Sequence, residues 1–307
     1  MGISHKLDEN KMDVFPGSNI FSYDESDSSL ITFEEDLKKV CVGMVDIIGS
    51  TRIAAKLTNQ NIARYYSTFL NILGNVIIQF QGKIVKNIGD SILYYFPEGS
   101  TQSQFVRCLE CNLSMIQIHE HLNMKLKNYG LPRLDYRISS DYGIVAIAKT
   151  QFLPEDIFGP SVNICSKINT LAQPNSVVIG NDFYEFVKSI ECYKFKAMTS
   201  FSSGLKNSYP VYAVSYDDCK IRGIITRCIE KTLLQMGTLD FEEVKNQLFQ
   251  RYNCFLADCY ERPEYLKETL EEVYGNGAKV ITKSIEKQIE EQSLPKPVKE
   301  FLINLKY

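Results

Sequence analysis

Two acidic residues stand beside apolar stretches in a way that favours metal binding. Asp46 ends an apolar run of strand length that begins at Lys39, and Asp90 forms a tight turn with Gly89 between two further apolar runs. A charge beside a buried strand is costly unless it has a partner, and hard divalent ions such as Mg²⁺ take one or two carboxylates plus substrate phosphates. If the two strands are neighbours, both carboxylates project from the same end of the sheet and form a metal pair. The alternative is structural: Asp46 caps the next helix and Asp90 only makes the turn.

The residues that follow Asp46 favour contact with phosphate. Gly49, Ser50 and Thr51 open a segment with helical periodicity, and the free amide groups of a helix N-terminus form a ready anion site. Ser50 or Thr51 is also a good helix N-cap. The two roles are compatible, and we predict that this turn contacts a triphosphate.

A third polar segment runs from Asp156 to Ile168 and reads DIFGPSVNICSKI. Asn163 and Lys167 lie four positions apart in its predicted helix and therefore share one helix face. Taken alone, Asp156 is typical of a turn. Lys86, three positions before the turn glycine Gly89, is by itself typical of an exposed strand residue.

In this order, and across about 120 residues, segments 45–51, 86–91 and 156–168 resemble the signature of the class III nucleotide cyclases. The resemblance implies that Asp46 and Asp90 hold two divalent metal ions, Mg²⁺ or Mn²⁺. It also implies that the backbone carbonyl of Ile47 reaches a metal. Two such ions ~3.5–4 Å apart suit an in-line displacement at phosphorus.

The resemblance further implies that Lys86 and Asp156 read the base. In the family, residues at these positions recognise adenine, because a donor serves the ring N1 and a carboxylate accepts from the exocyclic amine. Guanine presents the reverse pattern, so this pair should reject GTP. ATP is therefore the implied substrate.

Two residues of the third segment are implied to act on the reacting groups. Asn163 matches a family Asn that contacts the ribose region and orients the triphosphate. Lys167 stands where the family usually has an Arg that stabilises charge at the α-phosphate. A Lys keeps the charge but loses the planar fork that bidentate phosphate contact requires.

Three positions beyond these segments complete the expected site. Lys206 matches a family Lys that binds the β- and γ-phosphates. Ile144 stands where an Arg is often offered to the phosphates, and Asp141 adds a negative charge nearby. Arg137 is interpreted as structural.

The implied protein is an adenylate cyclase that converts ATP to 3′,5′-cyclic AMP and pyrophosphate in a head-to-tail homodimer. One protomer would supply the metal ligands, and the other would supply Lys86, Asp156, Asn163 and Lys167. A cyclase for GTP or a pyrimidine triphosphate is one alternative. A degenerate cyclase domain that binds nucleotide or partners without turnover is another, favoured by Lys167 and Ile144.

Alternating strand and helix patterns must position these residues. They indicate an α+β fold with a mostly antiparallel sheet, and the resemblance implies a ferredoxin-like cyclase domain over residues 37–216. We expect helices over 51–80, 101–128 and 161–171, and a strand pair over 136–149 with its turn near Gly143.

The two ends of the chain differ from this pattern. Residues 1–36 are polar and are expected to form a flexible arm. Residues 217–307 carry only helical periodicity, which predicts a small all-helical bundle. Dimerisation, binding of a regulatory partner and inert packing all remain open as its role.

Composition narrows the class of protein. Of the 307 residues, 44% are hydrophobic, which is normal for a globular chain. The formal net charge of −3 provides no basic field for nucleic acid or an anionic membrane. The apolar runs are far shorter than the ~18 residues of a membrane span, and no signal peptide is recognised. Nine scattered cysteines fit a reducing compartment, so we expect a soluble, cytoplasmic protein.

Overall fold

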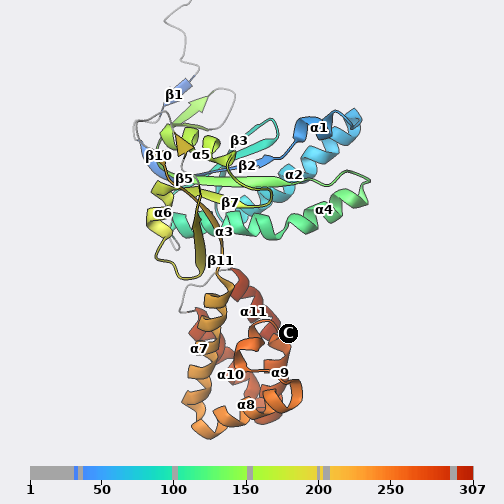
Figure 1. Cartoon of the computed structure of the whole chain (residues 1–307), viewed down its shortest axis with the longest axis vertical. Helices are drawn as coiled ribbons and strands as arrows, with labels where there is room; N and C mark the ends of the chain where they lie inside the picture. The colour runs from blue at the N-terminus through green and yellow to red at the C-terminus, as the bar shows by residue number, and fades with distance from the viewer. Residues whose placement is uncertain are drawn as a thin grey trace, which may run out of the picture.

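The computed structural model describes residues 31–33, 37–98, 103–150, 155–198, 201–202, 208–290 and 296–306. An α+β domain occupies one end of the molecule, and a region made only of helices occupies the other, beginning at α7 (Asp218–Met236) (Figure 1). The predicted architecture, an α+β domain followed by an all-helical region, is confirmed.

A single large sheet forms the centre of the α+β domain. Its strands are β1 (Ile31–Phe33), β2 (Lys38–Ile47), β3 (Lys83–Ile88), β4 (Ser91–Phe96), β5 (Tyr136–Thr150), β6 (Asp156–Phe158), β7 (Val177–Gly180), β8 (Tyr193–Ala197) and β11 (Val211–Tyr216). The strand order is β3-β4-β2-β5-β7-β11-β8, and β1 and β6 pair with β5. Only the β5–β7 pair is parallel among these described strands. A separate two-stranded sheet joins β9 (Phe201–Ser202) to β10 (Ser208–Tyr209).

The segment 136–149 is one strand and not the predicted strand pair. Gly143 continues the ladder, lying opposite Val40 of β2. The absence of its side chain serves a close approach, because a Cβ there would lie 3.1 Å from the Cβ of Ser161. A glycine inside a strand often marks such contact with another element.

The described part of the α+β domain contains six helices. They are α1 (Ser50–Ala54), α2 (Asn59–Gln79), α3 (Gln104–Gln117), α4 (His119–Asn128), α5 (Pro160–Asn169) and α6 (Asn181–Val187). The helix predicted over 51–80 is therefore two helices. Thr58 explains the break, because its side chain accepts a hydrogen bond from the amide of Asn61 and caps α2. The helix predicted over 101–128 likewise divides, at Ile118.

The two faces of the sheet have separate cores. Alternate residues of β2 such as Cys41 and Val45 pack with α2, α3 and α6 on one face. The intervening residues Val42 and Met44 pack with Cys165 of α5 on the other face. Since side chains alternate along a strand, Asp46 belongs to the α5 face.

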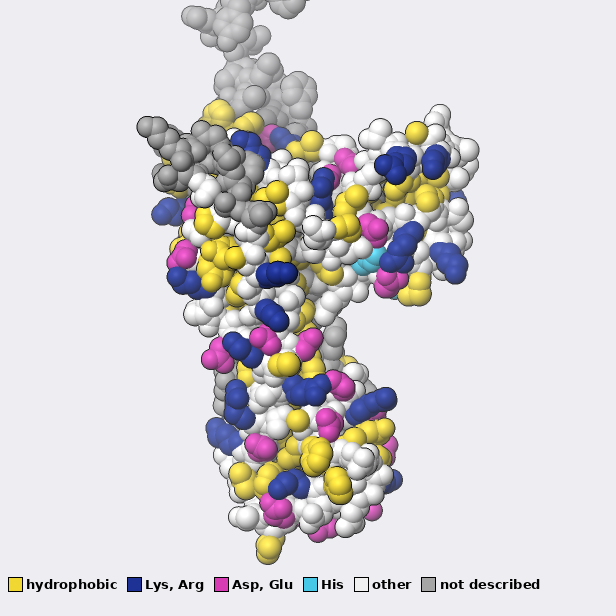
Figure 2. All heavy atoms as spheres, viewed as in Figure 1, with side chains coloured by type: hydrophobic (Ala, Val, Ile, Leu, Met, Phe, Trp, Pro, Cys, Tyr) yellow, Lys and Arg dark blue, Asp and Glu magenta, His cyan; other side chains and the backbone are white. Residues whose placement is uncertain are grey.

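The C-terminal region has a core of its own. After α7 it contains α8 (Thr238–Tyr252), α9 (Pro263–Tyr274), α10 (Ala278–Glu290) and α11 (Lys296–Lys306), with short 3₁₀ turns at Leu256–Tyr260 and Gly275–Gly277. The side chain of Asp217 caps α7 by accepting from the amide of Lys220. On the visible face of this region, Lys, Arg, Asp and Glu side chains are interspersed (Figure 2).

Two further observations bear on the ends of the chain and on membranes. Ile31–Phe33 lies within the segment expected to be an arm, yet it forms β1, which pairs with the end of β5. None of the helices in the described part of the chain combines the length and apolar character that a membrane crossing requires.

Candidate active site

The structure brings Asp46 and Asp90 together at one end of the sheet. Strands β2 and β4 are neighbours, and Asp46 lies opposite Ser91, the residue next to Asp90. The Ser91 hydroxyl donates to Asp46 Oδ1 over 2.6 Å. Asp90 follows Gly89, whose φ of +63° forms the left-handed turn that glycine adopts readily. The sheet pairing therefore brings the backbones of Asp46 and Asp90 to the same end of the sheet, and their role as a metal pair stays a prediction.

Arg137 shares this site, although it was predicted to be structural. It lies opposite Asp46 in the β2–β5 ladder. Its Nε and Nη2 both donate to Asp46 Oδ2, over 3.2 and 3.0 Å. The Arg137 and Asp46 side chains are 26% and 18% exposed, so a substrate can reach the pair. Arg137 is a candidate functional residue that the sequence analysis missed.

The oxygen donors at this end of the sheet suit a hard divalent cation. Asp46 and Asp90 supply carboxylates, and the backbone carbonyl of Ile47 follows at the end of β2. A carboxylate has about four lone-pair sites, so Ser91 and Arg137 leave Asp46 able to bind an ion. Across the described residues, no group of three or more His, Cys, Asp or Glu side chains is arranged to hold a metal. The site therefore fits an ion that also binds an anionic ligand such as a phosphate.

Lys86 and Asp156 form a second polar pair. The Lys86 Nζ lies 2.6 Å from Asp156 Oδ2, and Asp156 Oδ1 accepts from the amide of Ile157. The pairing of β6 with β5 sets Asp156 in place, opposite Ala148. The Lys86 ammonium also lies 5.7 Å from the ring centroid of Phe158. One cationic donor and one carboxylate acceptor thus stand side by side, which is the arrangement needed to read a ring with adjacent acceptor and donor groups.

Helix α5 presents Asn163 and Lys167 on its exposed side. Its opposite side is hydrogen-bonded to β2 and β5, the strands that carry Asp46 and Arg137. The buried Asn169 amide donates to the carbonyls of Met44 and Arg137, over 3.3 and 3.4 Å, and to the hydroxyl of Ser139. The helix is therefore fixed relative to the strands that carry Asp46 and Arg137.

The turn after β2 differs in detail from the prediction. Gly49, and neither Ser50 nor Thr51, is the N-cap of α1, with a φ of +69°. Helix α1 has five residues, so the expected long helix does not begin here. The first amide groups of a helix have no intrahelical acceptor, and this turn follows Asp46 and Ile47 directly.

The remaining predicted positions lie elsewhere. Lys206 falls outside the described residues. Ile144 pairs with Lys39, at the opposite end of β2 from Asp46. Seven strand residues separate the two ends, or about 23 Å. Within one chain Ile144 is therefore not beside Asp46, whereas Arg137 contacts it.

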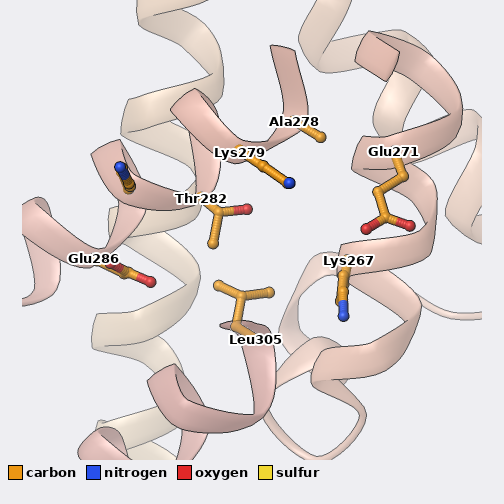
Figure 3. A pocket seen from close by; sticks show the side chains of 8 residues that line it. Lys267, Glu271, Ala278, Lys279, Thr282, Glu286 and Leu305 are labelled. Atoms are coloured by element: carbon orange, nitrogen blue, oxygen red, sulfur yellow. The ribbon is translucent and has the colours of Figure 1, made fainter. Parts of the chain in front are cut away.

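A separate pocket of about 360 Å³ lies among the C-terminal helices (Figure 3). Its charged lining mixes both signs, and none of the predicted site residues belongs to it. The lining residues are Lys267, Glu271, Ala278, Lys279, Thr282, Lys283, Glu286 and Leu305.

Comparison with known proteins places this chain in a family. The family model described as the adenylate and guanylate cyclase catalytic domain matches residues 33–212. An adenylate cyclase of Streptomyces coelicolor is 22% identical over 148 residues, which are 48% of this chain and 34% of that protein. An adenylate cyclase of Anabaena cylindrica is 24% identical over 139 residues, which are 44% of this chain and 28% of that protein. The matches thus span about a third of these relatives.

Solved structures share the fold. The adenylyl cyclase CyaB of P. aeruginosa superposes with a TM-score of 0.54 and 20% identity, covering 59% of this chain and 95% of that one. The guanylyl cyclase Cya2 gives a TM-score of 0.52 and 19% identity, covering 58% and 92%. An adenylyl cyclase and a guanylyl cyclase therefore both share this fold.

Proposed function

Because this chain belongs to the adenylate and guanylate cyclase family, we propose that it converts ATP to 3′,5′-cyclic AMP and pyrophosphate. The observation that favours adenine over guanine as the base is the 2.6 Å contact between Lys86 and Asp156. A Lys donor suits the acceptor N1 of adenine, and the Asp carboxylate suits its exocyclic amine. Guanine would set donor against donor and acceptor against acceptor, which costs far more than a missing methylene.

Asp46, Asp90 and the Ile47 carbonyl would hold two divalent ions, Mg²⁺ or Mn²⁺. When bound, such ions lower the pKa of the ribose 3′-hydroxyl and neutralise the triphosphate. The Ser91 hydroxyl holds Asp46 Oδ1 in place. Catalysis by the protein is then mostly positioning and charge stabilisation.

Arg137 could supply the bidentate phosphate contact that Lys167 cannot make. In this structure the Arg137 guanidinium rests on Asp46 Oδ2. We expect it to contact phosphate oxygens when nucleotide is present, because its fork permits bidentate contact and Lys167 permits none. This residue also weighs against the alternative of a module that binds nucleotide without turnover.

The other residues would orient the substrate. Asn163 and Lys167, on the exposed side of α5, would contact the ribose and the α-phosphate. Gly49, Ser50 and Thr51 would contact the triphosphate through their amides, and Lys206 would bind the β- and γ-phosphates. A head-to-tail homodimer would bring the exposed side of α5 of one protomer to the metal carboxylates of its partner.

Exchanging the polarity of the base-reading pair tests the proposal. Lys86→Glu combined with Asp156→Ser should lower kcat/KM for ATP by about 100-fold or more and raise the ratio of GTP to ATP turnover. Lys83→Glu is the matched control, because Lys83 lies on the same strand, is 52% exposed and pairs with Glu155 instead of Asp156. An unchanged ATP preference in the double variant would exclude Lys86 and Asp156 as the base readers.

A further inference from the structure

A second pocket, of about 470 Å³, lies at the end of the sheet opposite Asp46. It is bounded by β5 residues from Asp141 to Ile144, by the first turn of α5 and by α6. The lining residue Lys39 shows where the pocket lies, because Lys39 pairs with Ile144 at the other end of β2 from Asp46. The pocket is thus remote from the residues assigned to the cyclase reaction.

A buried carboxylate with one unsatisfied oxygen lines this pocket. Asp141 has no exposed surface. Its Oδ1 accepts a hydrogen bond of 2.9 Å from the hydroxyl of Tyr209, whereas Oδ2 has no hydrogen-bond partner among the described residues. A buried polar atom without a partner costs about 1–3 kcal/mol, so a ligand that donates to Oδ2 would recover a substantial free energy.

The charges around Asp141 favour a cation. Asp182 and Glu185 of α6 add two carboxylates to the lining, and Lys39 adds one ammonium. Lys188 pairs with Glu185, but no ion pair to Asp141 or Asp182 exists in the described part of the chain. The pocket of the C-terminal helices differs, because three lysines there face two glutamates.

The remaining walls favour an organic body on that cation. Tyr142 and Phe186 meet edge to face, with ring centroids 4.9 Å apart, and Ile144, Pro160 and Ile164 complete an apolar side. Aromatic faces attract ammonium groups by about 0.5–2 kcal/mol. A bare metal ion lacks this complementarity, and the described residues contain no acidic cluster arranged to hold one.

We propose that this pocket binds a small organic ammonium ion that carries at least one N–H group, which donates to Oδ2 of Asp141 once the side chains that cover this oxygen have moved aside. Pro160, Ser161 and Ile164 belong to α5, the helix that presents Asn163 and Lys167, so occupancy would bear on nucleotide turnover. That consequence rests on the proposed function. Binding itself does not.

Calorimetric titration of the full chain with benzylammonium, without nucleotide, tests the proposal. Saturable binding to one site is expected, with affinity at least about tenfold weaker in Asp141→Asn, since an amide keeps the acceptor for Tyr209 but removes the charge. Benzyl alcohol lacks the charge and benzyltrimethylammonium lacks the N–H, so both should bind more weakly. Ile144→Lys, at a position that is 46% exposed, should also weaken binding by introducing a competing ammonium.

The pH dependence of this binding is a second readout. Burial, opposed by the Tyr209 hydroxyl, raises the pKa of Asp141 to about 7. Affinity should therefore fall as the pH decreases below about 7, because the proton must leave before the ammonium binds. Other titratable groups near Asp141 are Asp182, Glu185 and Lys39 in the pocket lining, and Cys41 and Cys165 in the core. Burial raises the pKa of both thiols, so they stay neutral in this range.

The outcomes separate this proposal from the cyclase assignment. Equal benzylammonium affinity in wild type and Asp141→Asn, or no saturable heat with any of the three compounds, would overturn it. If Asp141→Asn fails to fold, unchanged affinity in Ile144→Lys would do the same. Loss of cyclase activity in another variant, such as Asp90→Ala, should leave the titration unchanged.

Discussion

Arg137 and Asp46 show how one contact changes the interpretation of a site at the scale of residues. They lie 91 positions apart in the chain, yet the guanidinium makes two hydrogen bonds to one carboxylate oxygen. Such charge-assisted bonds are roughly twice as strong as neutral ones. Asp46 is thereby held in place before any cation arrives, and Arg137 is a forked cation beside the expected phosphate position.

Replacing Arg137 with Lys should lower kcat by about 10- to 100-fold, because the charge remains and the fork is lost. Steady-state kinetics with ATP would measure the change. Arg133→Lys is the control, since Arg133 is 55% exposed and pairs with Glu120 and not with Asp46. Equal kinetics in both variants would return Arg137 to the structural role predicted from the sequence.

The buried Asp141 carboxyl should make the stability of the protein depend on pH. Its pKa is raised from 3.8 to about 7, chiefly by burial. Between these values the folded state binds a proton that the unfolded state has released, so the free energy of unfolding decreases as the pH rises from about 4 to 7. The loss amounts to at most roughly 4 kcal/mol.

Urea unfolding of wild type and Asp141→Asn at pH 5 and pH 8 would measure this effect. The variant should gain stability relative to wild type on going to pH 8, because it never carries the buried charge. Other titrating groups cancel in the comparison. A difference between the two proteins that stays constant with pH would contradict the raised pKa.

Helix α5 is the element on which the account depends. Its buried side is tied to β2 and β5 through Asn169, and its exposed side carries Asn163 and Lys167. The short strand β6 likewise holds Asp156 in place, because it pairs with β5. The elements that carry the candidate site residues are therefore attached directly to the central strands.

Asn169→Ala should destabilise the protein by about 1–3 kcal/mol, because it removes the buried hydrogen bonds from Asn169 to Met44, Arg137 and Ser139. It should also lower turnover by loosening α5. Urea unfolding and ATP kinetics would measure the two effects. Thr170→Ala, one residue further and exposed, should change stability far less, and equal effects would show that the Asn169 anchor is unimportant.

Elements differ in how far the sequence predicts them. The hairpin of β3 and β4 and the five C-terminal helices follow from local periodicity and turn residues. Gly143 was misinterpreted as a turn because a glycine needed for close packing against Ser161 has the same local signal. The Arg137–Asp46 contact was missed because it depends on the register of β2 against β5, which periodicity does not specify. Lys86 and Asp156, 70 positions apart, were paired only through the family resemblance.

The molecule has a separate core on each face of the sheet and a further core among the C-terminal helices. On the α5 face of the sheet, Lys86, Asn163 and Lys167 are partly or fully exposed, as is Asp90. A second protomer placed head to tail would cover this face and complete two shared sites.

Mixing Asp46→Ala with Asn163→Ala protein tests the shared site. Each variant alone should be inactive or nearly so, and the mixture should recover activity, because one site of each mixed dimer receives an intact half from each protomer. Mixing Asp46→Ala with Asp90→Ala is the control. Both changes affect the metal half, so no recovery is expected, and recovery in the control or none in the test would exclude this arrangement.

Identifying the product would test the proposed conversion of ATP to 3′,5′-cyclic AMP. The purified protein would be incubated with ATP, GTP, CTP and UTP, in Mg²⁺ and in Mn²⁺, and the products weighed by mass spectrometry. We predict 3′,5′-cyclic AMP and pyrophosphate from ATP, lost in Asp90→Ala. Formation of a different cyclic nucleotide in preference would contradict the adenine assignment, and no cyclic product from any nucleotide would contradict the assignment of turnover to this chain.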